Sequence, residues 1–450
     1  MRSPHSALSP DGRTCVSGAR RLAHLLLPLL LATAFPAPAA ETLADAWRAA
    51  LAVDGRLRAA DADSDAARSS LEAARGLALP KATASSSYTV LSKEPAARIG
   101  LPTLPGIALP DQMPLAERTY ATYALQATLP VYTGGRITAA INAADIGVQA
   151  SAFERSRSEQ AVKLDVAEAW LGVLRSRRAL AAAERHLAAL DAHALDVDDL
   201  HKQGLVPRND VLSVAVARAD ARQQLTRARH GVDLAAAAYN RLLRRPLDSP
   251  VDVAEPPPVD THRDALAALA ARARSLRPEL SLLGARAEAT DQEAEVERAA
   301  RRPQVGLSAA LLHEDNRYRV NQDMAQVSIG VQWDLFDGGI QRQRADAASA
   351  RARAARERQT DTASLIELEV HREWLAVDEA TERLTTTSTA IAQADDNLRV
   401  ARDRYRNGVG THTEVLDAEA LRTLTDGNHL NARYDLHLAR YRLKKAVGEL

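Results

Sequence analysis

Few side chains in the sequence have types and spacings that could do chemistry. His186 and His193 are seven positions apart and could face one side of a helix, as two ligands of a metal ion would. Helical histidines at this spacing are far more often surface residues, so we expect no metal site and no cofactor. Cys15 is the only cysteine, and the patterns GxxxxGK[ST], HExxH, GxSxG and CxxC are absent. The sequence therefore predicts a protein that is not an enzyme.

Two carboxylates follow a glycine-containing turn near the C-terminus. Glu414 and Asp417 are three positions apart in the stretch "NGVGTHTEVLDAEALR". Acidic side chains in the first turn of a helix are stabilised by the helix dipole, so a solvated helix start explains both residues without any function. A functional pair of carboxylates at a helix start explains them equally well, and the two interpretations stay open.

The segments that would position these residues occur twice. When the sequence is compared with itself at an offset of 204 positions, glycines, tryptophans and apolar pairs coincide without a gap. Upstream of these matches the offset becomes 223, because the first half has a longer loop. Such self-similarity indicates an internal duplication. The matched positions are Gly134 and Gly135 with Gly338 and Gly339, Trp170 with Trp374, Gly204 with Gly408, and Val211 and Leu212 with Val415 and Leu416.

A heptad pattern follows each pair of glycines and predicts long helices that pack like coiled coils. A continuous helix from Gly135 to about Gln203 would be roughly 100 Å long. Gly204 and Gly408 are suited to end such helices, and a second helix can return after each turn. The apolar seam is Val162, Val166, Ala169, Val173, Ser176, Leu180, Ala183, Leu187, Leu190, Ala194 and Val197 in the first half, and Ile366, Val370, Glu373, Val377, Ala380, Leu384, Thr387, Ile391, Ala394, Leu398 and Ala401 in the second.

Strands with one apolar face are predicted before each pair of glycines. Residues 119–132 and 326–336 alternate between apolar and small or polar side chains, and weaker partners precede them at 82–90 and 305–312. A soluble sheet packed on the helices is one interpretation. Hairpins of strands about ten residues long are also typical of outer membrane barrels. Four strands cannot close a barrel, so this interpretation requires several copies of the chain.

The N-terminus predicts export. Arg20 and Arg21 precede the apolar run from Leu22 to Phe35, and small residues follow, which is the layout of a secretory signal peptide over residues 1–40. The chain has a formal net charge of +0, which gives no electrostatic reason to expect nucleic acid as a partner. The expected organisation is a first repeat at 41–245 with its helical hairpin at about 134–245, a proline-rich linker at 246–261, and a second repeat at 262–450 with its hairpin at about 338–450.

This order of features resembles the TolC family of bacterial outer membrane factors. The resemblance rests on the junctions "VYTGG" and "LFDGG", on the turns "QGLVPRNDVL" and "NGVGTHTEVLDAEALR", and on the duplicated plan. It implies a mainly α-helical homotrimer in which four strands per protomer make one twelve-stranded transmembrane β-barrel, joined to a periplasmic α-helical barrel. A periplasmic adaptor or a structural coiled-coil protein remains the alternative.

The resemblance also implies a location, partners and a function. The protein would lie in the outer membrane lipid and extend into the periplasm, as the exit duct of a tripartite system for type I protein secretion or for efflux of drugs and other small molecules. A periplasmic adaptor (membrane fusion) protein and an inner membrane transporter, either ABC-type or proton-driven, would be its partners.

Particular residues acquire roles from the same resemblance. Tyr405 matches the gate tyrosine of the family and Asp210 its acidic partner, while Glu414 and Asp417 match acidic positions that narrow the pore. Gly410 stands where the family has a gate arginine, which Arg208 or Arg406 could replace. The strand-to-helix junctions would be Gly134, Gly135, Gly338 and Gly339. The adaptor-docking tips would be Gly204, Leu205, Val206, Pro207, Gly408, Val409, Gly410 and Thr411, although plain helix caps explain those glycines equally well.

Overall fold

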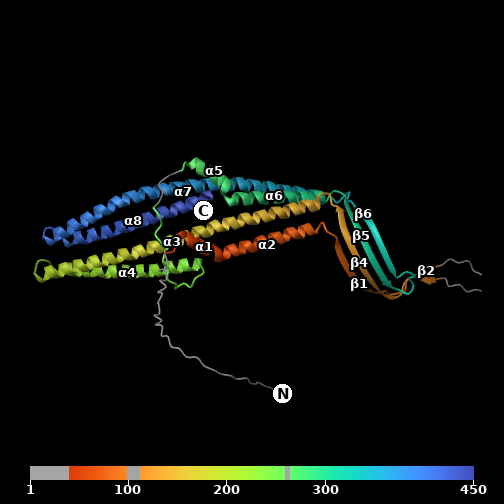
Figure 1. Cartoon of the computed structure of the whole chain (residues 1–450), viewed down its shortest axis with the longest axis horizontal. Helices are drawn as coiled ribbons and strands as arrows, with labels where there is room; N and C mark the ends of the chain where they lie inside the picture. The colour runs from red at the N-terminus through yellow and green to blue at the C-terminus, as the bar shows by residue number, and fades with distance from the viewer. Residues whose placement is uncertain (1–39, 99–111, 259–263) are drawn as a thin grey trace, which may run out of the picture. The chain divides into compact units, whose positions relative to one another are not determined.

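The two halves of the chain repeat one order of elements: two helices, a pair of long strands and a hairpin of long helices (Figure 1). A computed structural model describes residues 40–98, 112–258 and 264–450. The predicted signal peptide, apart from Ala40, lies outside these ranges. The first half contains α1 (Leu43–Val53), α2 (Gly55–Gly76), β1 (Lys81–Val90), β2 (Ala96–Arg98), β3 (Gln112–Pro114), β4 (Thr119–Tyr132), α3 (Arg136–Lys202) and α4 (Arg208–Leu242). The second contains α5 (Leu266–Leu276), α6 (Pro278–Ala299), β5 (Gln304–Asp315), β6 (Asp323–Gln332), α7 (Ile340–Arg406) and α8 (His412–Val447).

The last predicted strand is displaced toward the N-terminus. The sequence predicted residues 326–336, whereas β6 ends at Gln332. Its neighbour β5 begins at Gln304, which pairs with Gln332. The residues that follow Gln332 therefore have no partner residues in β5. The side chain of Trp333 instead donates a hydrogen bond from Nε1 to the carbonyl of Arg301, at 3.0 Å. The alternation of apolar residues continues past the point where the ladder ends.

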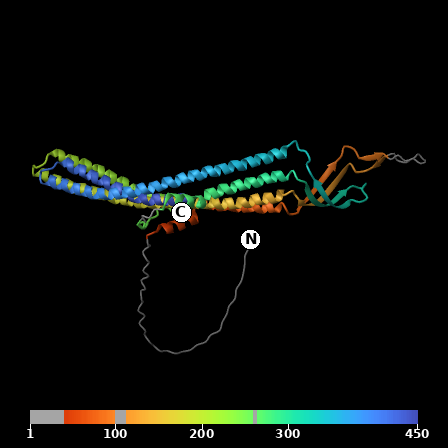
Figure 2. The ribbon, with the colours of Figure 1, turned by 90° about the horizontal axis from the view of Figure 1, so that it is seen from above.

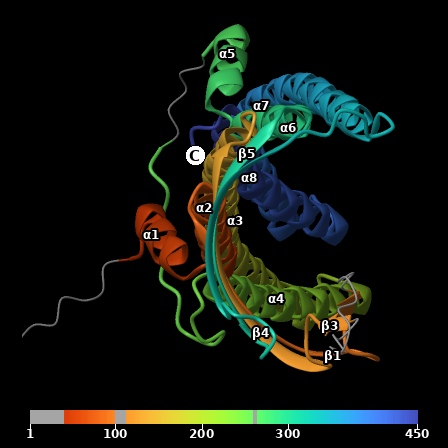
Figure 3. The same ribbon diagram turned by 90° about the vertical axis from the view of Figure 1, so that its right-hand side faces the viewer.

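The long strands form one antiparallel sheet in the order β1-β4-β5-β6. The central pair, β4 and β5, joins the two repeats. Figure 3 views the strands from their end of the helices and shows that they follow one curved surface. β1 and β6 are the outer strands, and each leaves one edge without a strand partner among the described residues. Such edges can pair with another copy of the chain.

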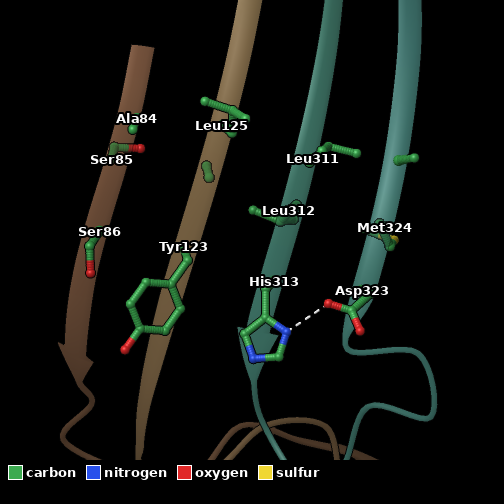
Figure 4. Close-up of a pocket in the computed structure, with 12 residues that line it drawn as sticks. Ala84, Ser85, Ser86, Tyr123, Leu125, Leu311, Leu312, His313, Asp323 and Met324 are labelled. Carbon is green, nitrogen blue, oxygen red and sulfur yellow. Dashed lines mark hydrogen bonds and ion pairs between the residues drawn. The ribbon is translucent and has the colours of Figure 1, made fainter.

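The register separates the sheet into an apolar and a polar face. Residues paired across neighbouring strands point to the same side. Leu125 pairs with Leu311, which pairs with Ala325, and the adjoining row is Tyr123, His313 and Asp323 (Figure 4). The His313 Nδ1 to Asp323 Oδ1 distance is 2.8 Å. On the other face the hydroxyls of Ser308 and Ser328 are 2.7 Å apart. Large apolar side chains are exposed, among them Val327 at 75% and Ile329 at 71%.

Glycines turn each second strand into a long helix. Gly134, Gly135, Gly338 and Gly339 all have positive φ, between 62° and 92°, a region that other residues occupy at a cost. Gly134 is also closely packed, because a Cβ added there would lie 2.6 Å from Cβ of Arg302. The residue before each pair supplies an oxygen acceptor. Asp337 accepts hydrogen bonds from the amides of Gly339 and Gln341, both at 2.9 Å.

The heptad seam lies where the sequence predicts it. Every seam position of α3 and α7 is buried or half-buried. In the middle of the helices, Trp170, Tyr239 and Tyr434 join one core cluster. A separate cluster near the ends of the hairpins combines α3, α4, α7 and α8, and contains Val197, Val214, Leu398, Ala401, Tyr405, Val415 and Ala418. The two hairpins are therefore packed against each other and not only within themselves.

The segment predicted as a proline-rich linker contacts both hairpins. Glu255 accepts hydrogen bonds from Arg178 of α3 and from Arg433 and Tyr434 of α8. Just before the segment, Arg245 makes two hydrogen bonds to the carboxylate of Glu41, at 2.8 and 2.9 Å, within the first repeat. The segment thus fastens the two repeats together at mid-length of the helices. Within the described ranges, no helix is both long and apolar enough to cross a membrane.

Candidate functional site: the tips of the helical hairpins

The turns of the two hairpins lie at the same end of the helices, opposite the strands (Figure 2). They have matching backbone hydrogen bonds. Gly204 donates to the carbonyl of His201 at 2.9 Å, and Gly408 donates to that of Tyr405 at 3.0 Å. Both glycines have positive φ, at 74° and 71°. This geometry ends an α-helix with a left-handed residue, so capping accounts for both glycines whether or not a partner binds there.

The turns expose apolar side chains. Leu205 is 66% exposed and Val409 is 68% exposed, while Val206 is half-buried beside the tip cluster of α3, α4, α7 and α8. Pro207 precedes α4, and the hydroxyl of Thr411 accepts a hydrogen bond from the amide of Glu414 at 3.3 Å. Leu205 and Val409 occupy equivalent positions in the two turns. Docking at these turns stays a prediction.

Tyr405 and Asp210 meet across the two hairpins. Tyr405 ends α7 in the second repeat, and Asp210 begins α4 in the first. The hydroxyl of Tyr405 donates a hydrogen bond to Oδ2 of Asp210, at 3.3 Å. The ring is buried in the tip cluster, with 6% exposed. Burial, and next the nearby carboxylate of Asp210, raise the pKa of Tyr405 to about 12. The phenol is therefore protonated and able to donate at any physiological pH.

An arginine also bridges the hairpins, but not at position 410, where the resemblance implied one. Nη2 of Arg406 on α7 lies 2.8 Å from Oδ2 of Asp196 on α3. Gly410 leaves no space for a side chain, since an added Cβ would be 2.9 Å from Cβ of Arg404 and 3.1 Å from the amide nitrogen of Tyr405. Of the two arginines considered as substitutes, Arg406 makes a bridging contact; Arg208 lies exposed at the start of α4.

Glu414 and Asp417 lie in the first two turns of α8. Glu414 is half-buried, and its Oε2 is 3.8 Å from Nη2 of Arg404. Asp417 is exposed and lines a groove of about 650 Å³. The two carboxylates are thus placed at the start of α8, near the helical tips. Whether they narrow a pore depends on other copies of the chain, so that role stays a prediction.

A buried pair of histidines is the feature that the sequence analysis missed. Nε2 of His193 on α3 and Nδ1 of His412, the first residue of α8, are 3.2 Å apart. Their rings are nearly parallel, with centroids 5.1 Å apart, and the ring of Tyr405 lies edge-on to His193 at 5.5 Å. Both histidines are at least nine-tenths buried. The only signal in the sequence was the position of His193 next to the heptad seam.

His186 and His193 do not form a common site. His186 Nδ1 is 3.0 Å from the hydroxyl of Thr423 and 3.9 Å from the buried carboxylate of Glu419. Glu419 in turn is paired with Arg402. In the part of the chain that the structure describes, no group of three or more histidine, cysteine, aspartate or glutamate side chains is arranged to hold a metal ion.

A family model identifies the relationships of this chain. The model described as "Outer membrane efflux protein" matches residues 47–243 and 269–449, which is most of both repeats. The chain belongs to the outer membrane efflux protein family. The resemblance drawn from the sequence is therefore confirmed, and so is the predicted location in the outer membrane with an extension into the periplasm. No protein in the curated set that was compared matches the chain by sequence.

Solved structures of outer membrane channels have the same fold. VceC from Vibrio cholerae is 18% identical with a TM-score of 0.74, over 90% of this chain and 96% of that one. CmeC from Campylobacter jejuni is 14% identical with a TM-score of 0.75, over 90% and 85%. MtrE from Neisseria gonorrhoeae, solved in an open state, is 18% identical with a TM-score of 0.71, over 90% and 88%. The predicted fold class, a duplicated strand hairpin with a long helical hairpin, is confirmed.

Membership of the outer membrane efflux protein family establishes the general function as an exit duct for efflux or secretion. The family model covers both repeats, whereas a periplasmic adaptor or a plain coiled coil would not be expected to match it. The family model and the similar folds establish the general function and not the roles of individual side chains. The roles of the tip residues stay predictions.

Proposed function

We propose that three copies of this chain form the outer membrane duct of a tripartite export system, closed at its periplasmic end by the helical tips. A periplasmic adaptor would bind the tips and connect the duct to an inner membrane transporter, either ABC-type or proton-driven. The duct would carry proteins or small molecules without chemistry of its own. The adaptor, the transporter and the gate go beyond what family membership establishes.

The main support for the assembly is that the outer strands, β1 and β6, each have one edge without a strand partner among the described residues. Its four strands alternate in direction, so β6 of one copy is antiparallel to β1 of the next when the sheets are placed side by side. A ring of such sheets closes without a free edge, and three copies give about twelve strands, within the range of outer membrane barrels. The apolar face with Val327 and Ile329 would then contact lipid, while Ser308 and Ser328 would face the lumen.

The support for a gate is that two polar contacts join the hairpins at their tips. Tyr405 with Asp210 and Arg406 with Asp196 each join α7 to the first hairpin. Moving the tips apart would break both contacts while the core cluster around Trp170 could stay intact. A relative, MtrE, has been solved in an open state, which indicates that this fold permits opening. Exposed Leu205 and Val409 offer the adaptor its contact surface.

The test is the mass of the protein extracted from outer membranes in mild detergent, measured by light scattering with the detergent subtracted. Three chains per particle are expected. Val327→Arg should reduce the trimer recovered from outer membranes, because arginine on the lipid face costs about 2–4 kcal/mol near the bilayer midplane. Gln326→Arg, on the other face of the same strand, is the matched control and should assemble normally. A soluble monomer, or equal effects of the two variants, would contradict the proposal.

A further inference from the structure

We propose that His193 and His412 form a proton-sensitive contact, which holds the two hairpin tips together while at least one ring is neutral and releases them when acidification protonates both. This inference rests on the proposed gate and adds a control to it. The contact joins α3 of the first repeat to α8 of the second, beside the Tyr405 to Asp210 hydrogen bond. Separation of the hairpins would therefore break the histidine contact as well.

The geometry of the pair requires at least one neutral ring. At 3.2 Å, Nε2 of His193 and Nδ1 of His412 share a single hydrogen, one nitrogen donating and the other accepting. If both rings were protonated, two N–H groups would face each other, and the hydrogen bond would be replaced by repulsion between two positive charges. A doubly protonated pair is therefore incompatible with the closed arrangement.

The surroundings of His412 oppose a positive charge. The residue is the first of α8, where the partial positive charge at the helix N-terminus disfavours a cation. Its second ring nitrogen, Nε2, is buried and has no hydrogen-bond partner among the described residues. Protonation of that nitrogen would leave an N–H group buried and unpaired, which is costly. Burial accordingly lowers the pKa of His412, although Asp210 acts in the opposite direction.

Charged groups around His193 act on its pKa in both directions. Burial is the largest influence, followed by repulsion from His412 and from Arg402 and Arg406 of α7, while Asp196 on α3 opposes them; together they lower the pKa of His193 to about 4. Tyr405 of α7 contacts both rings but stays neutral. Glu414 and Asp417 of α8 lie farther along the same tip.

The direction of the pH effect follows from linkage. In a separated state the rings contact water and have ordinary pKa values near 6.5, whereas in the closed state they bind protons less readily. The separated state therefore takes up more protons as the pH falls through 6.5, and the effect is complete below about 4 for His193. Solvent near the tip weakens these effects. We therefore expect the ratio of open to closed tips in each protomer to rise on the order of 10-fold between pH 7.5 and pH 4.5.

The primary test is single-channel conductance of the trimer in planar bilayers at pH 7.5, 6.0 and 4.5. The original protein should open more often as the pH falls, with a midpoint between 4 and 6.5. The double variant H193F/H412F keeps two rings but cannot be protonated, and its opening should vary little with pH. H193Q/H412Q serves the same purpose if the phenylalanine pair does not assemble. His230→Gln, at an exposed histidine on α4, is the matched control and should behave like the original protein.

A second measurement does not depend on conductance. Spin labels on Leu205→Cys and Val409→Cys, at the exposed tips of the two hairpins, report their separation. The distance should lengthen on acidification in the original background and stay constant in H193F/H412F. An acid response that persists in the double variant would overturn the inference and show that other groups cause the response. Absence of pores at every pH would instead contradict the proposed duct, and the label distances would still decide the histidine contact.

Discussion

Replacement of Tyr405 by phenylalanine removes one hydroxyl group from the contact between the hairpins and leaves the buried ring in place. The lost hydrogen bond spans 3.3 Å and ends on the carboxylate of Asp210. Hydrogen bonds to charged acceptors contribute about 1.5–3 kcal/mol. Asp210 is only half-buried and can be rehydrated, so we expect the lower end of this range, about 1.5 kcal/mol. That is roughly a tenfold shift toward the open state per protomer.

The number of copies decides how large the observed change is. If three protomers open independently, Tyr405→Phe should raise opening of each one about tenfold. If the three tips open together, the contributions add and the shift approaches about 1,000-fold. Conductance of the trimer in planar bilayers at pH 7.5 distinguishes these cases. The number of conductance levels and their occupancy show whether the tips open one at a time.

Tyr434→Phe is a matched control for this experiment. The hydroxyl of Tyr434 donates to the carboxylate of Glu255, also at 3.3 Å, but the residue lies in the core cluster at mid-length of the helices. This variant should lower thermal stability and leave resting conductance unchanged. Equal conductance of Tyr405→Phe and the original protein would refute the assignment of Tyr405 as a latch. An increase of the same size in Tyr434→Phe would mean that general loosening, not the tip contact, opens the duct.

Two further predictions concern the pore lining and the junctions. The double variant with Glu414→Ala and Asp417→Ala should weaken block by divalent cations and reduce cation selectivity in bilayers, and unchanged block would show that these carboxylates are ordinary residues at a helix start. Gly134→Ala should lower the temperature at which the trimer dissociates more than Gly339→Ala does. Both substitutions cost about 1–2 kcal/mol for a positive φ. Of the two, only Gly134 has neighbours within 4 Å of an added methyl group, namely the side chain of Arg302 and the carbonyl oxygen of Ala299. Equal dissociation temperatures would contradict the close packing at Gly134.

Local sequence patterns determined the elements of this protein. Heptads, alternation and glycine pairs predicted the long helices, the strand faces and the junctions, because these patterns depend on residues near one another in the chain. The helices α1, α2, α5 and α6 received no prediction, since they are shorter and carry no seam. The end of β6 was misplaced, because the length of a strand depends on its partner, and β5 begins only at Gln304.

Only the tertiary structure decided which residues meet. The order β1-β4-β5-β6 joins the two repeats in one sheet, and no periodicity within either repeat specifies that pairing. His193 and His412 are 219 positions apart, and each looks like an ordinary helical histidine in the sequence. They become a buried, coupled pair because packing of α3 against α8 excludes water from both rings. A duplicated pattern predicts two similar hairpins, whereas the contacts that differ between them arise where the hairpins pack together.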